Sequence, residues 1–155
     1  MARTMNPEAK GDARTAILDA AMELVGRDGA ASLSMRELAR RAGVSHQTPN
    51  HHFKTRDGLL SELAVRGFVE LDRVIGDAIA GAGDDGRDQL VAAGAAYVQF
   101  ALRRRGLFRL MWQHAELTPD AHARMNEAYS ASWRKLEGAV ARLNGLPEGD
   151  PDASA

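Results

Sequence analysis

Apolar residues recur with the spacing of an amphipathic helix through almost the whole chain. Residues 12–27 carry Ile17, Ala21 and Leu24 at intervals of three and four, which places them on one helical face. A longer stretch, residues 55–79, repeats this pattern, and Thr55 is its predicted N-cap. We find no segment with the period of two that a half-buried strand requires. The pattern predicts an all-α fold of about seven helices.

Glycines and capping residues mark the ends of these helices. Gly29 ends the first, and the polar, glycine-rich residues 81–86 end the long one. The last helix begins at residues 118–120, a threonine, a proline and an aspartate, and ends at residues 144–145. The inward face of the fifth helix is predicted to consist of Leu90, Val91, Ala95, Val98 and Leu102.

Two short helices joined by a tight turn are predicted within residues 34–53. Leu38 and Ala39 belong to the apolar stripe of the first, and Gly43 can take the left-handed backbone that ends a helix. Ser45 then has the position of an N-cap for the second. Helices joined in this way form a helix-turn-helix, whose second helix enters the major groove of DNA.

The segment from Thr15 to Leu60 resembles the N-terminal DNA-binding domain of the TetR family of transcriptional regulators. The matching positions are the opening helix, the sequence LAxxAGVS at residues 38–45, the His52-Phe53 pair, and a basic-acidic-x-Leu start to the fourth helix at residues 56–59. This resemblance implies a three-helix DNA-binding domain, a palindromic double-stranded operator and a homodimer.

Two positions depart from the family pattern. Asn50 stands where the family usually has an aromatic residue, and Pro49 replaces a common aliphatic one. If Ser45 is the N-cap, Pro49 is the fourth helical residue and its missing N–H forfeits only the first intrahelical bond. We expect a cost well below the ~3 kcal/mol of a mid-helix proline.

The stretch YVQFALRRRGLFRLMW, residues 97–112, resembles the ligand-binding domain of one TetR branch. The family usually adds two further helices that pair with a second subunit, and we expect this chain to lack them. The predicted organisation is a flexible N-terminal tail (1–11), a helix-turn-helix domain (12–57), an incomplete helical ligand-binding domain (58–145) and a disordered tail (146–155).

Base-edge contacts set sequence preference, whereas phosphate contacts set affinity and register. The residues predicted to contact base edges are His46, Gln47, Thr48 and His51. The residues predicted to contact phosphates are Ser34, Arg36, Ser45, Asn50, His52, Lys54, Thr55 and Arg56. Alternatives stay open for three of them, namely packing for Thr48 and a solvated surface position for Arg36 and Arg56. Arg40 and Arg41 are predicted to face solvent, and Phe53 to join the core.

Aromatic residues and methionines are concentrated where the fifth to seventh helices are expected to converge. A few of these side chains end in a polar group and have apolar neighbours, so the set suits a pocket for a small apolar or aromatic effector. The alternative is that these residues belong to the ordinary hydrophobic core. The predicted pocket residues are Phe68, Leu71, Tyr97, Phe100, Phe108, Met111, Trp112, Met125, Tyr129 and Trp133.

Charge and composition narrow the class of protein. Residues 1–60 carry nine Lys/Arg against seven Asp/Glu, and residues 61–155 carry eleven against fourteen, so the basic half holds the helix-turn-helix. Cysteine is absent, which excludes disulfides and thiolate zinc sites. No apolar run approaches the ~20 residues of a membrane span, and the polar start has no signal-peptide core. We expect a cytoplasmic protein without a membrane partner.

The chain contains patterns typical of other protein classes, but the residues and elements around them do not suit those functions. Residues 81–86 match G-x-G-x-x-G, but they follow a helix, and Asp84 and Asp85 would repel a pyrophosphate. Neighbouring His51 and His52 cannot share a helix face as metal ligands. A second scattered set is formed by His114, Glu116, Asp120 and His122. No nucleophile motif is present, so we predict no enzyme, no metal and no cofactor.

The sequence leaves three hypotheses about the function open. The leading hypothesis is a ligand-responsive, sequence-specific transcriptional regulator, and the family tendency favours a repressor. The second is an effector-free DNA-binding protein that organises the chromosome. The third is a protein-interaction module, if a chain without the usual last helices cannot dimerise.

Overall fold

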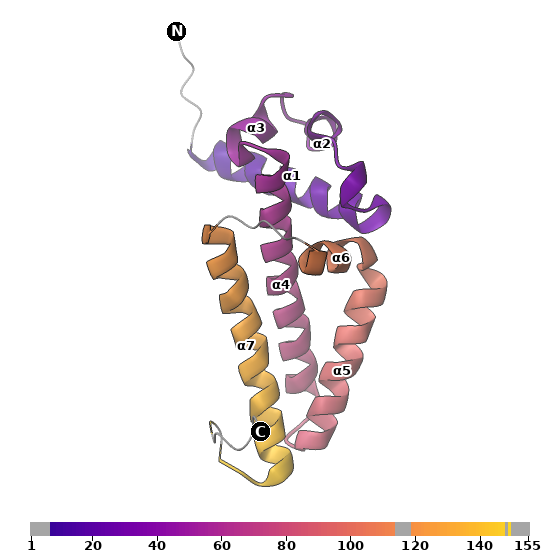
Figure 1. Ribbon diagram of the computed structural model, residues 1–155, viewed down its shortest axis with the longest axis vertical. Helices are drawn as coiled ribbons and strands as arrows, with labels where there is room; N and C mark the ends of the chain where they lie inside the picture. The colour runs from indigo at the N-terminus through magenta and orange to yellow at the C-terminus, as the bar shows by residue number, and fades with distance from the viewer. Residues whose placement is uncertain (1–6, 114–118, 148, 150–155) are drawn as a thin grey trace. The chain divides into compact units, whose positions relative to one another are not determined.

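The structure, a computed structural model, describes residues 7–113, 119–147 and 149. Within these residues the chain forms seven α-helices, one short 3-10 helix and no strand (Figure 1), which confirms the predicted all-α fold. The elements are α1 (Pro7–Asp28), η1 (Ala30–Ser32), α2 (Met35–Arg41), α3 (Thr48–Phe53), α4 (Arg56–Gly81), α5 (Gly86–Arg103), α6 (Arg105–Gln113) and α7 (Pro119–Asn144).

The chain divides into two compact units. Unit 1 comprises residues 1–64 and 105–118, and unit 2 comprises residues 65–104 and 119–155. The predicted helix-turn-helix domain therefore lies within unit 1, but this unit also includes α6. None of the described helices is both long and apolar enough to cross a membrane.

The first helix begins earlier than the sequence predicted. It starts at Pro7 rather than near Asp12, so residues 7–11 of the predicted flexible tail are helical. Proline suits the first helical position because its φ is preset and its missing N–H has no partner there. At the other end of the chain, Gly145 (φ 68°) ends α7 as predicted, with the Leu146 N–H donating to the Ala141 carbonyl over 2.8 Å.

The core of unit 1 forms where α6 packs on α1. Ile17 and Val25 of α1 and Leu107 of α6 are completely buried. Gly106 lies so close to the Val25 carbonyl that any side chain there would collide with it. The sequence prediction assigned α6 to the ligand-binding domain, because no local pattern indicates a contact between residues about 80 positions apart.

In unit 2, α5 and α7 run side by side in opposite directions (Figure 1). The start of α5 meets the end of α7 at Gly86, where a Cβ would collide with the backbone of Ala139 and Leu143. Farther along α7, the Lys135 ammonium donates to the Asp72 carboxylate of α4 over 2.6 Å. Close backbone approach thus joins α5 to α7, and the hydrogen bond between Lys135 and Asp72 joins α7 to α4.

The inward face of α5 is not the predicted one. Its buried residues are Gly86, Gln89, Ala93 and Phe100. Of the five residues predicted to point inward, Leu90 is half-buried, whereas Val91, Ala95, Val98 and Leu102 are exposed. Gly86 lets the backbone of α7 approach closely, and Phe100 fills the same buried side of α5, so the aliphatic stripe that was predicted to point inward faces solvent.

Replacing Gly106 by Ala should destabilise unit 1, because the added methyl group must push α6 away from the Val25 carbonyl. We expect the free energy of unfolding in urea to fall by about 1–3 kcal/mol. Gly26→Ala is the matched control, since a Cβ at this helical position meets nothing within 4 Å. That control should be neutral or stabilising by up to ~1 kcal/mol. Equal urea midpoints for the two variants would contradict the proposed contact.

Candidate nucleic-acid interface

The turn that ends α2 is built by a left-handed glycine, as the sequence predicted. Gly43 has φ 66°, and its N–H donates to the Arg40 carbonyl over 3.4 Å. The Val44 N–H donates back to the Ala39 carbonyl over 3.0 Å. These two bonds form a Schellman motif, which satisfies carbonyl groups at the helix end and reverses the chain.

The next helix starts later than predicted. Gln47 is the N-cap of α3, and the predicted cap, Ser45, lies in the preceding turn, where its hydroxyl is 2.8 Å from that of Thr48. The N-cap prediction for Ser45 was therefore wrong. Pro49 becomes the second helical residue, where an N–H would have no intrahelical partner, so the helix loses no bond through it.

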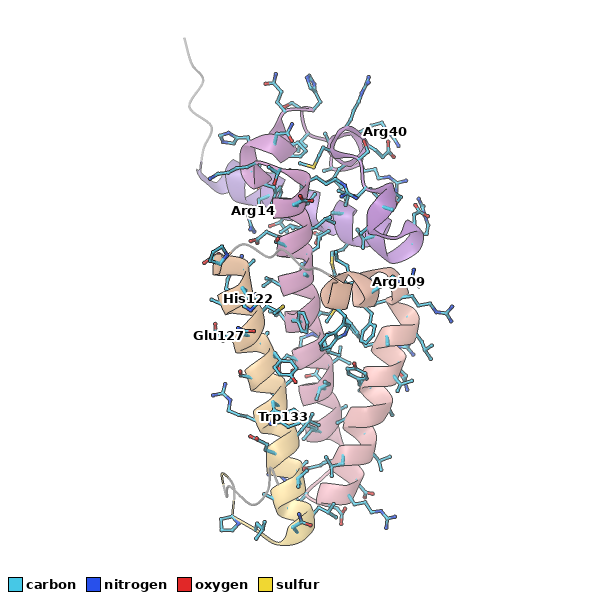
Figure 2. The ribbon with its side chains drawn as sticks, viewed as in Figure 1. Arg14, Arg40, Arg109, His122, Glu127 and Trp133 are labelled. Atoms are coloured by element: carbon cyan, nitrogen blue, oxygen red, sulfur yellow. The ribbon has the colours of Figure 1, made fainter. Side chains whose placement is uncertain are left out.

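Two buried side chains hold α3 on the rest of unit 1. Pro49 is less than 2% exposed and Phe53 is 5% exposed, which confirms the predicted core position of Phe53. The Arg14 guanidinium of α1 (Figure 2) lies 5.3 Å from the centre of the Phe53 ring. Arg14 also donates to the Glu62 carboxylate of α4 over 2.5 Å. The anchor of α3 thus joins three helices.

The opposite side of this segment is exposed and polar. His46, Gln47, Asn50 and His51 are exposed, and Thr48 is half-buried. Because the Thr48 hydroxyl bonds to Ser45, it contributes to the turn. Base contact by Thr48 and the packing alternative both stay predictions. His52 is half-buried, with its ring edge-on to that of His51 at 5.5 Å.

A tight connection leads from α3 into α4. Lys54 has φ 59°, and the Thr55 N–H donates back to the Phe53 carbonyl over 2.6 Å, a three-residue γ-turn that is strained for any residue except glycine. The Thr55 hydroxyl accepts the Gly58 N–H over 3.0 Å, which confirms its predicted capping of α4. A Cβ at Gly58 would collide with the Phe53 carbonyl. This geometry holds the Lys54 side chain in solvent beside α3.

One predicted phosphate ligand has a local structural role. Arg56 donates to the Ala30 carbonyl over 2.6 Å and to the Leu33 carbonyl over 3.2 Å, so it holds η1 and the start of α2. The phosphate contact of Arg56 stays a prediction beside this role. Sequence spacing could not reveal it, because the partners lie 23 and 26 residues upstream.

The exposed side of the helix-turn-helix is cationic. Residues 34–56 contain five Lys/Arg and a single acid, Glu37. Glu37 accepts hydrogen bonds from Arg40 (2.7 Å) and Arg41 (2.8 Å), which lower the pKa of its carboxyl group to about 2. Arg40 points into solvent, as predicted (Figure 2). A hollow of about 410 Å³ beside α2 is lined by Ser34, Arg36, Arg40 and His46 among others.

The predicted effector residues are divided between the two units. Phe108, Met111 and Trp112 lie in unit 1 and the other seven in unit 2. The half-exposed members are Tyr97, Trp112, Tyr129 and Trp133, and the buried ones are Phe68, Leu71, Phe100 and Met111. Phe100 lines a cavity of about 380 Å³ with polar and charged neighbours that include Glu70 and Arg104. Convergence of the ten residues on one pocket stays a prediction.

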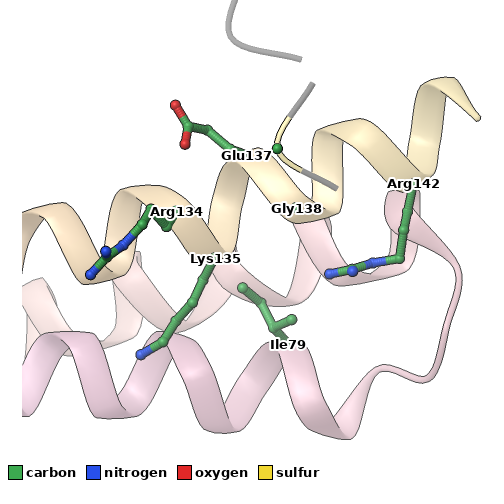
Figure 3. A pocket seen from close by; sticks show the side chains of 7 residues that line it. Ile79, Arg134, Lys135, Glu137, Gly138 and Arg142 are labelled. Atoms are coloured by element: carbon green, nitrogen blue, oxygen red, sulfur yellow. The ribbon is translucent and has the colours of Figure 1, made fainter. Parts of the chain in front are cut away.

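A second cavity in unit 2 differs in chemistry from the predicted effector site. It has a volume of about 390 Å³, and its lining includes Ile79, one acid, Glu137, and three cations of α7, Arg134, Lys135 and Arg142 (Figure 3). Lys135 is neutralised by Asp72, and Arg142 donates to the Gln89 side chain over 2.8 Å. This cavity contains none of the ten predicted residues.

Within the described residues, no group of three or more His, Cys, Asp or Glu is arranged to hold a metal ion. Of the scattered set considered from the sequence, Asp120 and His122 lie at the start of α7. His114 and Glu116 lie outside the described residues.

Residues 17–63 match the family model described as bacterial regulatory proteins, tetR family. The helix-turn-helix segment is therefore identified as that of a tetR-family protein. The matched residues begin at Ile17 in α1, end at Leu63 in α4 and include all of α2 and α3.

Three known proteins are similar to this chain over most of its length. The HTH-type transcriptional regulator BetI of Rhizobium meliloti (strain 1021) is 28% identical over 124 residues, which are 80% of this chain and 54% of that protein. A Rhodococcus sp. RHA1 structure described as a protein with unknown function is 37% identical, with a TM-score of 0.76, over 97% of this chain and 77% of that one. The TetR family regulator PfmR of Thermus thermophilus, 20% identical with a TM-score of 0.66 over 89% and 76%, shares the fold. This chain thus spans about half the length of the BetI protein.

The sequence prediction missed two supports of the interface. Arg14 carried no signal, because its partners are reached only through the fold. For Pro49, the prediction considered only the energetic cost of a proline in the helix and not its burial. An apolar residue among polar neighbours could have indicated that this side chain is buried.

The Glu37 ion pairs should make stability depend on pH. Since the folded-state pKa is lowered to about 2 from 4.5, their contribution is complete above pH 4.5 and is lost as pH falls towards 2. In urea unfolding, the stability difference between the wild type and Glu37→Gln should shrink between these two values. Glu23→Gln, at an exposed position of α1, is the control and should show less pH dependence. A difference that is unchanged at low pH would refute the role of these pairs.

Proposed function

We propose that this protein is a transcriptional regulator that reads double-stranded DNA through α3 and the turn before it. The supporting observation is the combination of two buried anchors, Pro49 and Phe53, with exposed polar side chains at His46, Gln47, Asn50 and His51. A helix that is anchored by its buried side and presents hydrogen-bonding groups on its exposed side suits the major groove of DNA, which is about 12 Å wide.

The two kinds of contact are divided along the segment. Gln47 and His51 offer hydrogen bonds to base edges, with His46 and Thr48 beside them. The cations Arg36 and Lys54 flank this group and suit phosphate oxygens, together with the other predicted phosphate ligands. Family membership favours a homodimer on a palindromic operator and a repressor that a small apolar or aromatic effector releases.

Selection from a random duplex library with this chain tests the proposal. The expected result is enrichment of a sequence with two related half-sites about one helical turn apart. Recovery of many unrelated sequences would instead favour the chromosome-organising alternative. If no duplex is retained even at low salt, the DNA-binding proposal is wrong.

Two substitutions should separate base reading from phosphate binding. Gln47→Ala should cost about 1–3 kcal/mol on the selected duplex and relax preference at one base pair. Lys54→Gly should weaken all duplexes alike and reduce the salt dependence by about one phosphate contact. Glycine also suits the positive φ at this position, so stability should not fall. Binding is measured by fluorescence anisotropy at several salt concentrations.

Arg134→Ala is the control for Lys54→Gly, because it removes an exposed cation of α7 in unit 2. Its duplex affinity and salt dependence should equal those of the wild type. Parallel losses in both variants would show that net charge, and not the position of Lys54, governs binding.

An effector can be detected through the two tryptophans. Trp112 and Trp133 are both about half exposed, so a nearby apolar ligand should change their emission. We expect a saturable change with some members of a panel of small aromatic compounds, and a matching loss of duplex affinity. Trp112→Phe and Trp133→Phe assign the signal to a unit. A panel without any response, or binding without an effect on DNA affinity, would contradict effector control.

A further inference from the structure

Three of the chain's five histidines lie within residues 46–52, on the segment proposed to read DNA. His46 and His51 are exposed, and His52 is half-buried beside His51. An imidazole ring ordinarily changes its charge between about pH 5 and pH 8. These side chains can therefore change the charge of the surface near neutral pH, in addition to forming hydrogen bonds.

We infer that binding of double-stranded DNA takes up protons at His46 and His51, so that the protein binds its duplex more tightly as pH falls from about 8 to about 6. Since this surface is the one proposed to read DNA, the inference rests on the proposed function. A polyanion stabilises a charged imidazolium beside it, so the complex holds more protons than the free protein does. The added affinity is complete at low pH, where the rings are charged before binding. It is lost as pH rises and the bound rings become neutral.

The charged groups around His46 leave it without a carboxylate partner. The hollow that His46 lines also contains Arg36, Arg40 and a single acid, Glu37. Glu37 accepts hydrogen bonds from Arg40 and Arg41, and because its pKa is about 2 it keeps its charge from pH 8 to pH 6. Among the residues that the structure describes, Glu37 pairs with these arginines and forms no ion pair with His46. A phosphate or a base edge is thus the partner that a charged His46 suits.

His51 has a similar environment on α3, which packs on α1 and α2. Its ring is edge-on to that of His52, with the ring centres 5.5 Å apart, so two charged rings would repel each other and we count one proton for the pair. On the side of α1, Arg14 donates to Glu62 of α4, so this carboxylate already has a cationic partner. Lys54, which follows the helix, adds a further cation. DNA therefore supplies the anion that a charged His51 requires.

The hydrogen-bonding groups of DNA also favour the charged ring. An imidazolium has two N–H donors, whereas a neutral imidazole has one donor and one acceptor. Phosphate oxygens are acceptors only, and guanine presents the two acceptors N7 and O6 in the major groove. Protonation thus strengthens contacts of both kinds, so the expected proton uptake is the same whether a ring meets a phosphate or a guanine edge.

Calorimetry of duplex binding measures the proton uptake directly. The probe is the duplex selected from the random library, titrated into the full chain near neutral pH in several buffers that differ in ionisation enthalpy. We expect the observed heat to change with the buffer in proportion to an uptake of about one proton per chain. A heat of binding that is independent of the buffer would overturn the inference.

The double variant His46→Gln/His51→Gln assigns the protons. By fluorescence anisotropy at constant salt, the affinity of the wild type should rise about tenfold from pH 8 to pH 6, whereas that of the double variant should change less than about twofold. Glutamine keeps hydrogen-bonding groups but does not titrate. The ratio of the two affinities also cancels any change in base reading that the substitutions cause.

His122→Gln is the matched control, because it removes an exposed histidine of α7 in unit 2 (Figure 2). It should keep the wild-type ratio of affinities, and circular dichroism at both pH values verifies that each variant remains helical. A double variant with the wild-type ratio, or an equal loss of the ratio in His122→Gln, would refute the assignment to His46 and His51. Equal wild-type affinities at both pH values would overturn the inference but leave the proposed function standing. If no duplex is retained at either pH, both are wrong.

Discussion

The candidate interface depends on how a helix of six residues is held in place. An isolated helix of this length is not stable in water, because nucleation costs more than so few hydrogen bonds return. α3 therefore owes its position to the burial of Pro49 near its start and Phe53 at its end. Arg14 covers the Phe53 ring and is itself held by Glu62. Phe53 thus connects α3 with α1 directly and with α4 through Arg14, and its burial determines which side of α3 faces solvent.

This arrangement divides the polar residues into two groups. Thr55 and Arg56 direct their side chains to backbone groups nearby, and Glu37 holds Arg40 and Arg41. In the part of the chain that the structure describes, Arg36 and Lys54 form no ion pair. Basic residues of one short segment are therefore not equivalent, since some stabilise the fold that presents the others. The backbone at Lys54 is strained, and glycine would be easier to accommodate there, so the lysine agrees with the phosphate contact proposed for its side chain.

Features set by local chemistry could be predicted from the sequence. The periodicity of α1 and α4, the left-handed turn at Gly43 and the cap at Thr55 each depend on a few neighbouring residues. The start of α3 could not be predicted in this way, because Ser45 is as good a cap by composition as any residue of the turn. Burial of Pro49 favours a helix that begins later, at Thr48. The role of Arg56 and the contact of α6 with α1 depend on partners distant in sequence, so no local pattern could indicate them.

The orientation of α5 shows a further limit of apolar periodicity. A repeat of three and four residues indicates that a helix has an apolar side, but not which neighbour covers it. α5 has two such sides, a buried one with Gly86, Ala93 and Phe100 and an exposed one with Val91, Val98 and Leu102. α7 approaches the buried side closely because Gly86 has no Cβ to collide with the backbone of Ala139 and Leu143. The backbone approach at one glycine therefore decides which apolar side of α5 is buried in this unit, although the exposed side has the larger number of branched aliphatic residues.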